Sequence, residues 1–342
     1  MKGVHVLLLN WNGWGDTLEC LESLLRSDCC DLRVVVCDNG STDGSLTRLQ
    51  AWARGDLDLW VPAAARLKHF SFPPVAKPVP YALLSRKEAE AGGAVDRAAR
   101  LILIDNEANL GFAGGNNVGL RYLLRRDDLA YVWLLNNDTV VRADALGELL
   151  TRVGADPQAG MCGSTLLCYH DPGQVQAHGG AYYCRWIGLA WHLGRLKKTH
   201  HPINAGKVEA RMNYVVGASM LVSQRFLREI GLLCEDYFLF FEELDWALRA
   251  EGRFTLLYAP QSVVYHKVGA SVGTSSNPAK KSAVCDYWNA RNRIFFTRRW
   301  FPEALPTVYL ALLGTLLTRV LMRRWDRAAM LLRLLVTGGA TH

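Results

Sequence analysis

The sequence lacks the simple features of a secreted, disulfide-linked protein. Its nine cysteines are an odd number and are scattered without paired spacing. Met1 leads directly into a strand-like run instead of a charged segment followed by a cleavable apolar one. We therefore expect reduced thiols and a cytoplasmic location.

A long hydrophobic run is also missing. The longest uncharged stretch, residues 304–318, has 15 residues, whereas a helix that spans the hydrocarbon of a bilayer needs about 20. Because an arginine follows at position 319, this stretch predicts a helix that lies on a membrane surface and does not cross it.

Two further motif classes are absent. The sequence contains neither GxGxxG nor GxxxxGK[ST], so dinucleotide-binding and P-loop chemistry have no support. One group of possible zinc ligands has spacings that match no ordinary zinc site; its members are Cys162, Cys168, His170, His178 and Cys184. We expect no zinc centre there.

The composition describes a folded chain with a basic tail. The 342 residues are 50% hydrophobic and 21% charged, which is enough apolar material for a large core. The formal charge of +7 is uneven, because residues 278–342 contain 11 Lys or Arg against 3 Asp or Glu. The remainder of the chain is almost neutral, which separates the tail from the body.

Alternating patterns predict a doubly wound α/β fold with a mostly parallel sheet. Residues 1–60 read as strand, helix, strand, helix, and the same order returns from residue 101. Continuous apolar runs such as Val34, Val35 and Val36 are typical of strands covered on both faces. Residues 61–98 are rich in proline and predict a loop insertion. We therefore expect one domain over residues 1–275 and a helical extension over residues 276–342.

Polar residues follow the first two predicted strands. Asn10 and Asn12 follow the first, and Asp38 and Asn39 follow the second. Ligands of open α/β sheets bind at the carboxyl ends of strands, so these side chains are candidates for contact with a base or a ribose. The alternative is a plain turn, because Asn-Gly and Asp-Gly favour turns and Ser, Thr and Asp cap helices.

Two later segments extend the candidate site. NLGFAGGNN, residues 109–117, places glycines before a helix, where free N–H groups bind anionic or sugar ligands; a structural turn is the alternative. LLNNDT, residues 134–139, ends a strand with Asp138. A single carboxylate holds Mg²⁺ or Mn²⁺ when diphosphate oxygens share the coordination shell, so Asp138 predicts a metal bridged to a nucleotide diphosphate. Its alternative role is a helix N-cap.

The segment FLFFEELDW, residues 238–246, places three acids among large apolar residues. Like charges beside an apolar wall raise a carboxyl pKa, which suits a general acid or base, and we name Glu242, Glu243 and Asp245 as candidates. An acidic first helical turn that complements the helix dipole is the alternative. His266 follows a later strand and is a candidate to complete a metal site with Asp138 or to bind phosphate.

The ordered set of these motifs resembles the family 2 glycosyltransferases of the GT-A fold. In chain order the motifs are NWNG, VVVCDNGSTDGS, NLGFAGGNN, LLNNDT, GASMLVS, FFEELDWALRAEG and YHKVG. The likeness is to the bacterial rhamnosyltransferase and galactofuranosyltransferase branch that assembles surface polysaccharides, and it covers residues 3–270 without the insertion. It implies a dTDP- or UDP-sugar donor, Mg²⁺ or Mn²⁺, and a nucleotide-binding half followed by an acceptor half.

The resemblance also implies roles for single residues. Glu243 occupies the position of the family's catalytic base, with Asp245 as a substitute, and Asp138 ends the metal motif. His266 resembles a metal-coordinating histidine of the galactofuranosyl branch. Expected donor contacts come from Asn10, Asn12, Asp38, Asn39, Asn109, Gly111, Phe112, Asn116, Asn137 and Asp138. A single displacement with inversion at the anomeric carbon follows from one base and no covalent intermediate.

The basic tail fits an acceptor at a membrane. Arginines interleave with aromatic residues in residues 288–301, a mixture that favours an anionic lipid surface or a lipid diphosphate. Acceptor or membrane contacts are expected from Trp246, Arg291, Arg293, Arg298 and Arg299. We expect a glycan or polyprenyl-diphosphate-linked acceptor, a peripheral position at the inner face of the cytoplasmic membrane, and no nucleic-acid partner. A pair of dimer-forming helices is the alternative for the tail.

Two other functions stay open for the sequence as a whole. A catalytically silent protein that binds a nucleotide sugar and recruits partners through its tail has the same motifs. A nucleotidyltransferase has a related α/β architecture, but it releases pyrophosphate and not a nucleoside diphosphate.

Overall fold

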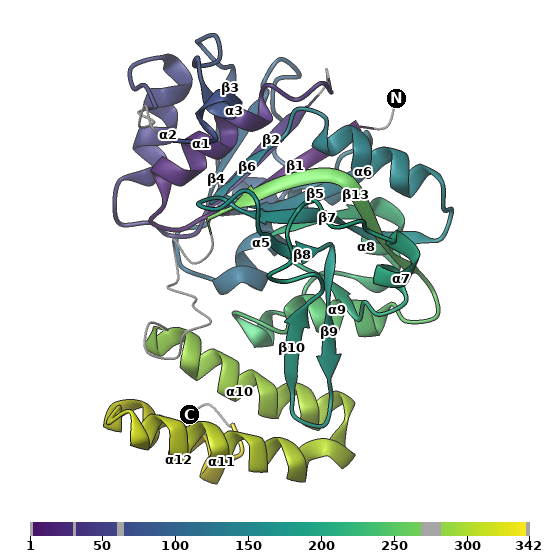
Figure 1. The fold of residues 1–342 in the computed structure, drawn as a ribbon. Helices are drawn as coiled ribbons and strands as arrows, with labels where there is room; N and C mark the ends of the chain where they lie inside the picture. The colour runs from purple at the N-terminus through teal and green to yellow at the C-terminus, as the bar shows by residue number, and fades with distance from the viewer. Residues whose placement is uncertain (1–2, 30–31, 60–64, 268–281, 340–342) are drawn as a thin grey trace.

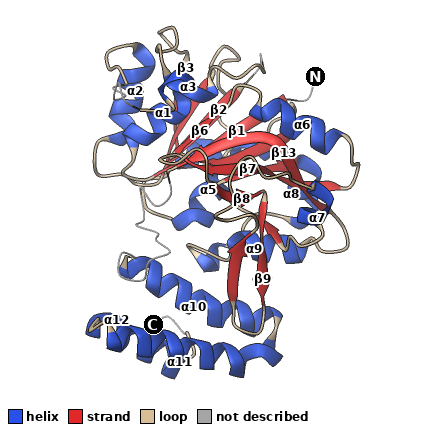
Figure 2. Cartoon of the chain, in the orientation of Figure 1, coloured by secondary structure: helices blue, strands red, loops and turns tan. Residues whose placement is uncertain are grey.

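The computed structural model describes residues 3–29, 32–59, 65–267 and 282–339, and it shows a large sheet between helices, with a helical unit at one side (Figures 1 and 2). The strands are β1 (Gly3–Asn10), β2 (Arg33–Asp38), β3 (Tyr81–Ser85), β4 (Leu101–Asp105), β5 (Leu129–Asn136), β6 (Thr139–Val141), β7 (Ala159–Cys168), β8 (Val175–His178), β9 (Gly180–Cys184), β10 (Leu189–His192), β11 (Tyr214–Val215), β12 (Ser219–Ser223) and β13 (Thr255–His266). The α-helices are α1 (Trp14–Leu24), α2 (Ser45–Arg54), α3 (Lys68–Ser71), α4 (Arg86–Glu90), α5 (Gly111–Leu124), α6 (Ala145–Gly154), α7 (Ala205–Glu209), α8 (Gln224–Ile230), α9 (Glu242–Arg249), α10 (Ala283–Trp300), α11 (Leu305–Leu321) and α12 (Trp325–Thr337). Two 3₁₀ turns, Glu235–Tyr237 and Pro302–Ala304, precede α9 and α11.

The main sheet has the strand order β3-β4-β2-β1-β5-β12-β7-β13-β6, with β8 paired to β7. The first five of these strands are parallel to one another. Strand β12 runs antiparallel between β5 and β7, and β6 is antiparallel to β13. The sheet is therefore mostly parallel, which confirms the predicted doubly wound α/β class.

Apolar residues of the central strands alternate between two cores. In β1, Val6 and Leu8 face the core formed with α1, α2 and α6, whereas Leu7 faces the core that contains α5, α8 and α9. Successive side chains of a strand point to opposite faces, so a strand covered by helices on both sides needs apolar residues at every position. This is why the strand sequences are continuous apolar runs.

The sequence predicted that residues 61–98 form a loop, but this segment also contains regular secondary structure. It contains α3 and α4, and β3 extends the parallel sheet by pairing with β4. The prediction missed β3 because this strand lies at the sheet edge, with a short and half-exposed sequence. Residues 159–215, where the sequence pattern is weak, form β7, β8 and a small antiparallel sheet in the order β10-β9-β11.

The C-terminal unit consists of α10, α11 and α12, which share a small apolar core. The run Pro302–Leu321 has 20 residues; an 18-residue stretch within it has a mean hydropathy of 1.6 and is 22% buried. By length and composition this run is long enough to cross a membrane. The prediction that it is too short is wrong, because it counted only the uncharged part of the helix. The predicted domain boundary at residue 275 lies outside the described residues.

Candidate active site

Polar strand ends surround a cavity at the carboxyl edge of the sheet. Because β1, β2 and β5 are parallel, their terminal residues Asn10, Asp38 and Asn136 come to the same edge. The cavity beside them has a volume of about 230 Å³. Its lining includes Trp11, Asn39, Asn109, Gly111, Phe112, Asn137, Asp138, Phe238, Glu242, Glu243 and His266. Most of the predicted donor-binding and catalytic residues therefore share one space.

Asn10 and Asp38 come to the same edge and form a hydrogen bond with each other. The Asn10 amide donates to Asp38 Oδ1 at 2.6 Å, and Ser41 donates to the same carboxylate from Oγ at 2.7 Å and from its backbone N–H at 3.1 Å. Asn12 Oδ1 accepts from the Thr42 backbone N–H at 2.8 Å. These side chains do not line the cavity. They hold the two loops that follow β1 and β2 against each other.

The glycine-rich segment begins α5 and does not precede it as predicted. Gly111 has a φ of 73°, and a Cβ there would collide with the backbone of Phe238. The Asn39 amide donates to Asn109 Oδ1 at 2.9 Å and to the Gly111 carbonyl at 3.2 Å, which ties this turn to the end of β2. Asn116 is buried, donates to the Phe112 carbonyl within its own helix and does not line the cavity.

Asp138 and His266 form the candidate metal centre. Asp138 Oδ1 lies 3.0 Å from His266 Nε2, and both side chains are buried. Burial opposes ionisation of Asp138, but His266, a backbone hydrogen bond and the charge of Lys267 together outweigh it and lower the carboxyl pKa. His266 Nδ1 lies 3.0 Å from Gln176 Oε1, which orients Nε2 toward Asp138.

This pair suits a hard divalent cation that shares its shell with a ligand. A carboxylate oxygen and an imidazole nitrogen are ordinary donors for Mn²⁺, and Asp138 alone is a donor for Mg²⁺. Within the described residues, no group of three or more His, Cys, Asp or Glu side chains converges on one point. The residues therefore fit a metal whose other ligands are oxygens from a bound substrate or water.

Glu242 and Glu243 begin α9 and face the same cavity. Burial raises the pKa of both carboxyl groups, and the charge of Glu243 raises that of Glu242 further. Glu243 Oε1 accepts from the Gly217 backbone N–H at 3.2 Å, and a Cβ at Gly217 would collide with this oxygen. A glycine at position 217 therefore lets the carboxylate approach the backbone.

The turn before α9 is strained and is held by α10. Phe238, Phe240 and Phe241 have φ values of 58°, 69° and 77°, in the left-handed region that non-glycine residues seldom adopt. The buried Asn292 amide donates to the carbonyls of residues 237, 239 and 240 at 2.7, 2.8 and 3.0 Å. One side chain of the C-terminal unit therefore binds three carbonyls of the turn that places Glu243.

A second cavity of about 480 Å³ adjoins the first. Glu243, His266, Asn136, Ala218 and Phe240 line both. The remaining walls of the larger cavity come mainly from the β9–β10 hairpin, with further residues from β11, α9 and α10. They include Tyr183, Trp191, His192, Arg195, Tyr214 and Asn289. Glu243 thus lies where the two spaces meet.

Two predicted residues of α9 do not reach either cavity. Asp245 is fully buried and accepts from Arg249 Nε and Trp300 Nε1, both at 2.9 Å. Trp246 is also fully buried, and its indole N–H donates to the Gly231 carbonyl at 2.9 Å. Asp245 as a substitute base and Trp246 as an acceptor contact are therefore wrong, because successive helix residues point about 100° apart.

Two of the four predicted membrane-binding arginines of α10 are buried, whereas Arg298 and Arg299 are exposed. Arg291 is 9% exposed and donates to the Asp236 carbonyl at 2.8 Å. Arg293 is 4% exposed and donates to the Ile187 carbonyl. Arg299 lies 3.7 Å from Asp245, and Arg298 donates to the Gly338 carbonyl at 2.9 Å. The predicted membrane contacts of Arg291 and Arg293 are therefore corrected, since buried guanidinium groups present no charge to a lipid.

Sequence reasoning did not find Gln176, Asn292 or the aromatic walls of the second cavity. Gln176 lies in a short strand and Asn292 in the middle of a basic helix, so neither has a motif around it. Their importance comes from the atoms that they contact.

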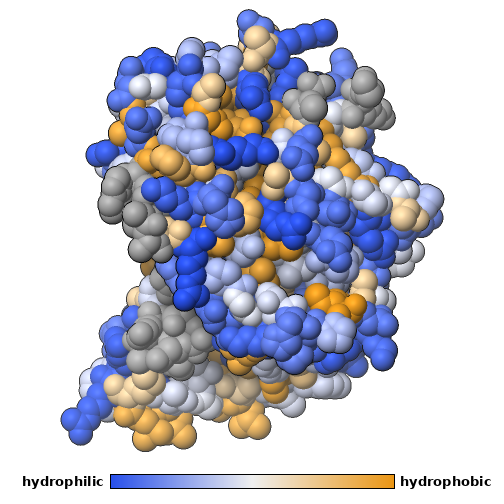
Figure 3. Space-filling model, turned by 45° about the horizontal axis from the view of Figure 1, so that its top comes forward, coloured by the Kyte–Doolittle hydropathy of each residue, from blue (hydrophilic) through white to orange (hydrophobic). Residues whose placement is uncertain are grey.

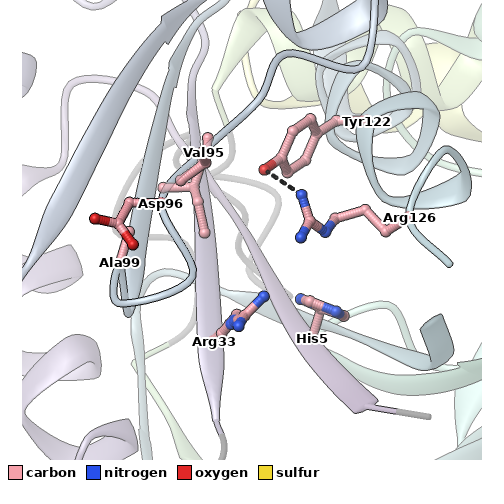
Figure 4. Close-up of a pocket in the computed structure, with 8 residues that line it drawn as sticks. His5, Arg33, Val95, Asp96, Ala99, Tyr122 and Arg126 are labelled. Atoms are coloured by element: carbon pink, nitrogen blue, oxygen red, sulfur yellow. Dashed lines mark hydrogen bonds between the residues drawn. The ribbon is translucent and has the colours of Figure 1, made fainter. Parts of the chain in front are cut away.

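Another titratable cluster lies near the start of β1, and Figure 4 shows His5, Arg33 and Arg126 of this cluster. His5 Nε2 lies 3.6 Å from Asp128, and Arg33 and Arg126 approach the same carboxylate at 3.4 and 3.5 Å. The space between these side chains is too small for a water molecule. Burial lowers the pKa of His5 to about 4. This cluster therefore bears on stability and not on ligand binding.

Comparisons with known proteins agree with this geometry. Residues 89–230 match the family described as Glycosyl transferase family 2. The Low-salt glycan biosynthesis hexosyltransferase Agl10 of Haloferax volcanii is 27% identical over 147 residues, which are 43% of this chain and 45% of Agl10. The chain thus matches less than half the length of this curated relative.

Two solved structures share the fold. The mannosyltransferase PcManGT from Pyrobaculum calidifontis, in complex with GDP-Man and Mn²⁺, has a TM-score of 0.51 at 16% identity, over 98% of this chain and 86% of its own. GalNAc-T7 with UDP, GalNAc and Mn²⁺ has a TM-score of 0.53 at 11% identity, over 90% and 50%. The chain therefore has the GT-A fold, and within it residues 89–230 are similar to the Glycosyl transferase family 2 model.

Proposed function

We propose that this protein is an inverting, metal-dependent glycosyltransferase that moves a hexose from a nucleotide sugar to an acceptor hydroxyl. The observation that carries the proposal is that Asp138, His266 and Glu243 line one cavity, and that Glu243 and His266 also line the next. Agl10 is a hexosyltransferase, and two proteins of the same fold bind GDP-Man or UDP together with Mn²⁺. These similarities support the reaction class.

The two cavities suit two substrates. The smaller cavity receives the donor, because Asp138 and His266 lie in it and because Asn39 and Asn109 offer amide groups to polar ligand atoms. The larger cavity receives the acceptor. Its walls of Tyr183, Trp191 and Tyr214 offer flat apolar surfaces with polar edges, which suit the faces and hydroxyl groups of a sugar.

The reaction follows from the position of Glu243. Its carboxylate removes the proton of the acceptor hydroxyl, that oxygen bonds to the anomeric carbon, and the bond from that carbon to the diphosphate breaks. Attack from the side opposite the leaving group inverts the anomeric centre. A divalent cation held by Asp138 and His266 would neutralise charge on the departing diphosphate. Burial raises the Glu243 pKa, which makes this carboxylate a stronger base.

For the substrates we propose a rhamnose or galactofuranose donor, carried by dTDP or UDP, and a polysaccharide or lipid-linked glycan acceptor in cell-surface glycan synthesis. The order of motifs from NWNG to YHKVG supports this branch. A panel of dTDP- and UDP-sugars with Mg²⁺ or Mn²⁺, assayed for release of the nucleoside diphosphate, tests the donor.

Three variants test the mechanism. Glu243→Gln should lower kcat by roughly 10²–10⁴-fold and leave donor binding intact, since only the base is lost. Asp138→Ala should also weaken binding of the donor with Mn²⁺. Glu251→Gln, at an exposed acid of the turn after α9, is the control and should change neither.

The outcomes separate the alternatives. Transfer by Glu243→Gln at the parent rate refutes the catalytic assignment. Donor binding without turnover by the parent protein indicates the silent binding protein, and pyrophosphate release from a nucleoside triphosphate indicates a nucleotidyltransferase.

A further inference from the structure

We propose that α11 and α12 form a docking face that lies in the plane of an anionic lipid bilayer. The face, here called the apolar ridge, consists of exposed residues on both helices: Leu310, Leu313, Leu317 and Leu321 of α11, and Trp325, Ala329, Leu332 and Val336 of α12. Figure 3 shows hydrophobic surface along the lower edge of the molecule, where these helices lie. The residues differ from those that the sequence suggested, which belong to α10.

The α11 side of the ridge carries no charge. Leu310, Leu317 and Leu321 are 69%, 58% and 74% exposed. Their spacing, with Leu313, follows one face of a helix. The other exposed residues of this helix are Pro306, Thr307, Gly314 and Thr318, and its one charged residue, Arg319, is buried. An uncharged exposed face along a helix of 17 residues is unusual for a surface in water.

The α12 side continues the same pattern. Trp325, Leu332 and Val336 are 63%, 53% and 81% exposed, and with Ala329 they recur at helical spacing. Buried residues of both helices, including Leu312 and Leu331, form the small core with α10. Each helix therefore uses one face for the protein and leaves an apolar face outside.

Charge favours a lipid surface over a second copy of this chain. Residues 305–339 contain 5 arginines and 1 aspartate. Arg323 and Arg333 are exposed beside the ridge. A twofold dimer through the ridge would bring equivalent basic residues together, whereas anionic headgroups would neutralise them. This composition is typical of helices that lie at a membrane interface.

Internal ion pairs favour a helix that lies on the membrane over one that crosses it. Arg319 donates to both carboxylate oxygens of Asp286 in α10, at 2.8 and 2.9 Å, and Arg327 reaches the same carboxylate at 3.0 Å. Insertion of α11 across a bilayer would break these buried contacts and place Arg319 in hydrocarbon, which is costly. Docking through the ridge leaves them unchanged.

The test is co-sedimentation of the full chain with vesicles of phosphatidylcholine, alone or with about one third phosphatidylglycerol, at about 0.1 M salt. The parent should bind the anionic vesicles. Leu317→Ser/Leu321→Ser should lower the partition coefficient at least ~10-fold, because two large side chains no longer enter the interface. The matched control, Leu83→Ser/Leu196→Ser, changes two exposed leucines elsewhere and should bind like the parent.

The charge contribution is tested separately. Arg323→Gln/Arg333→Gln should lower binding to the anionic vesicles roughly 10-fold and leave binding to phosphatidylcholine unchanged. Thermal unfolding checks that each variant is folded. The proposal is overturned if the parent stays in solution, if Leu317→Ser/Leu321→Ser binds like the parent, or if that variant loses only a concentration-dependent dimer. Donor hydrolysis is measured in parallel, so loss of docking with retained turnover leaves the proposed function untouched.

Discussion

Asn292 should act as a positioning residue for Glu243, although it lies in the C-terminal unit and lines neither cavity. Its amide has two N–H groups, and the carbonyls of residues 237, 239 and 240 lie within 3.0 Å of it. Asn292→Ala removes both donors without adding bulk. We expect the turn to leave its left-handed conformation and to move the start of α9.

The size of the expected effect of Asn292→Ala follows from two opposing contributions to the free energy of the turn. Three non-glycine residues in the left-handed region cost about 1–2 kcal/mol each, or roughly 3–6 kcal/mol together. Two hydrogen bonds from Asn292 contribute about 1–3 kcal/mol, and their loss also leaves the buried Tyr237 carbonyl unpaired at about 1–3 kcal/mol. The strain is thus comparable to what the amide contributes. A shift of about 1 Å at a reacting group costs on the order of 10²-fold in rate.

The assay is kcat and donor KM for nucleoside diphosphate release across pH. For Asn292→Ala we expect kcat to fall roughly 10–100-fold. The acidic limb of the pH profile should move toward the ordinary carboxyl range, because Glu243 becomes less buried. Asn292→Asp should not restore kcat, since it replaces the donor by an acceptor, whereas Arg298→Ala in the last turn of α10 should behave like the parent.

A purely structural role for Asn292 makes a different prediction. If the variant loses active fraction but keeps the parent's pH profile and kcat per active site, Asn292 only stabilises the fold. The positioning argument is then refuted.

Three further perturbations test the site and its surroundings. Glu242→Gln should raise the free energy of unfolding more at pH 8 than at pH 5. Burial and the Glu243 charge raise the Glu242 pKa, so the parent protein becomes less stable as the pH rises through that pKa, and the variant does not. Urea unfolding at both pH values checks this, and equal changes contradict it. Gln176→Ala should weaken Mn²⁺ binding in the presence of nucleoside diphosphate by about 10–100-fold, because His266 loses the partner that orients it; calorimetric titration measures it, and an unchanged affinity removes the metal role of His266. His5→Leu should reduce the loss of folding stability on acidification. The His5 pKa is lowered from 6.5 to about 4 in the folded protein, so the unfolded chain takes up the proton first. Between these two pH values the parent should lose up to about 3 kcal/mol, and an equally steep loss in the variant would refute the assignment.

Much of the candidate site could be predicted because parallel strands end at a common edge. Asn39, Asn137 and Asp138 follow apolar runs in the sequence, and topology then brings the strand ends together. The same logic failed within α9. Glu243 and Asp245 are two positions apart, so they point about 200° apart around the helix, and only the packing of the helix decides which of them faces the cavity.

Outside residues 61–98 and 159–215, local sequence determined the order of strands and helices. It also determined the polar residues at the strand ends and the apolar character of the last helices. Hydrophobic periodicity and strand length are properties of neighbouring residues, so they can be read without a fold. Tertiary structure alone decided that Asn292 binds the turn before Glu243, that Gln176 orients His266, and that Arg291 and Arg293 are buried. These contacts join residues more than 50 positions apart, and their free energies depend on which surfaces meet, which no local pattern encodes.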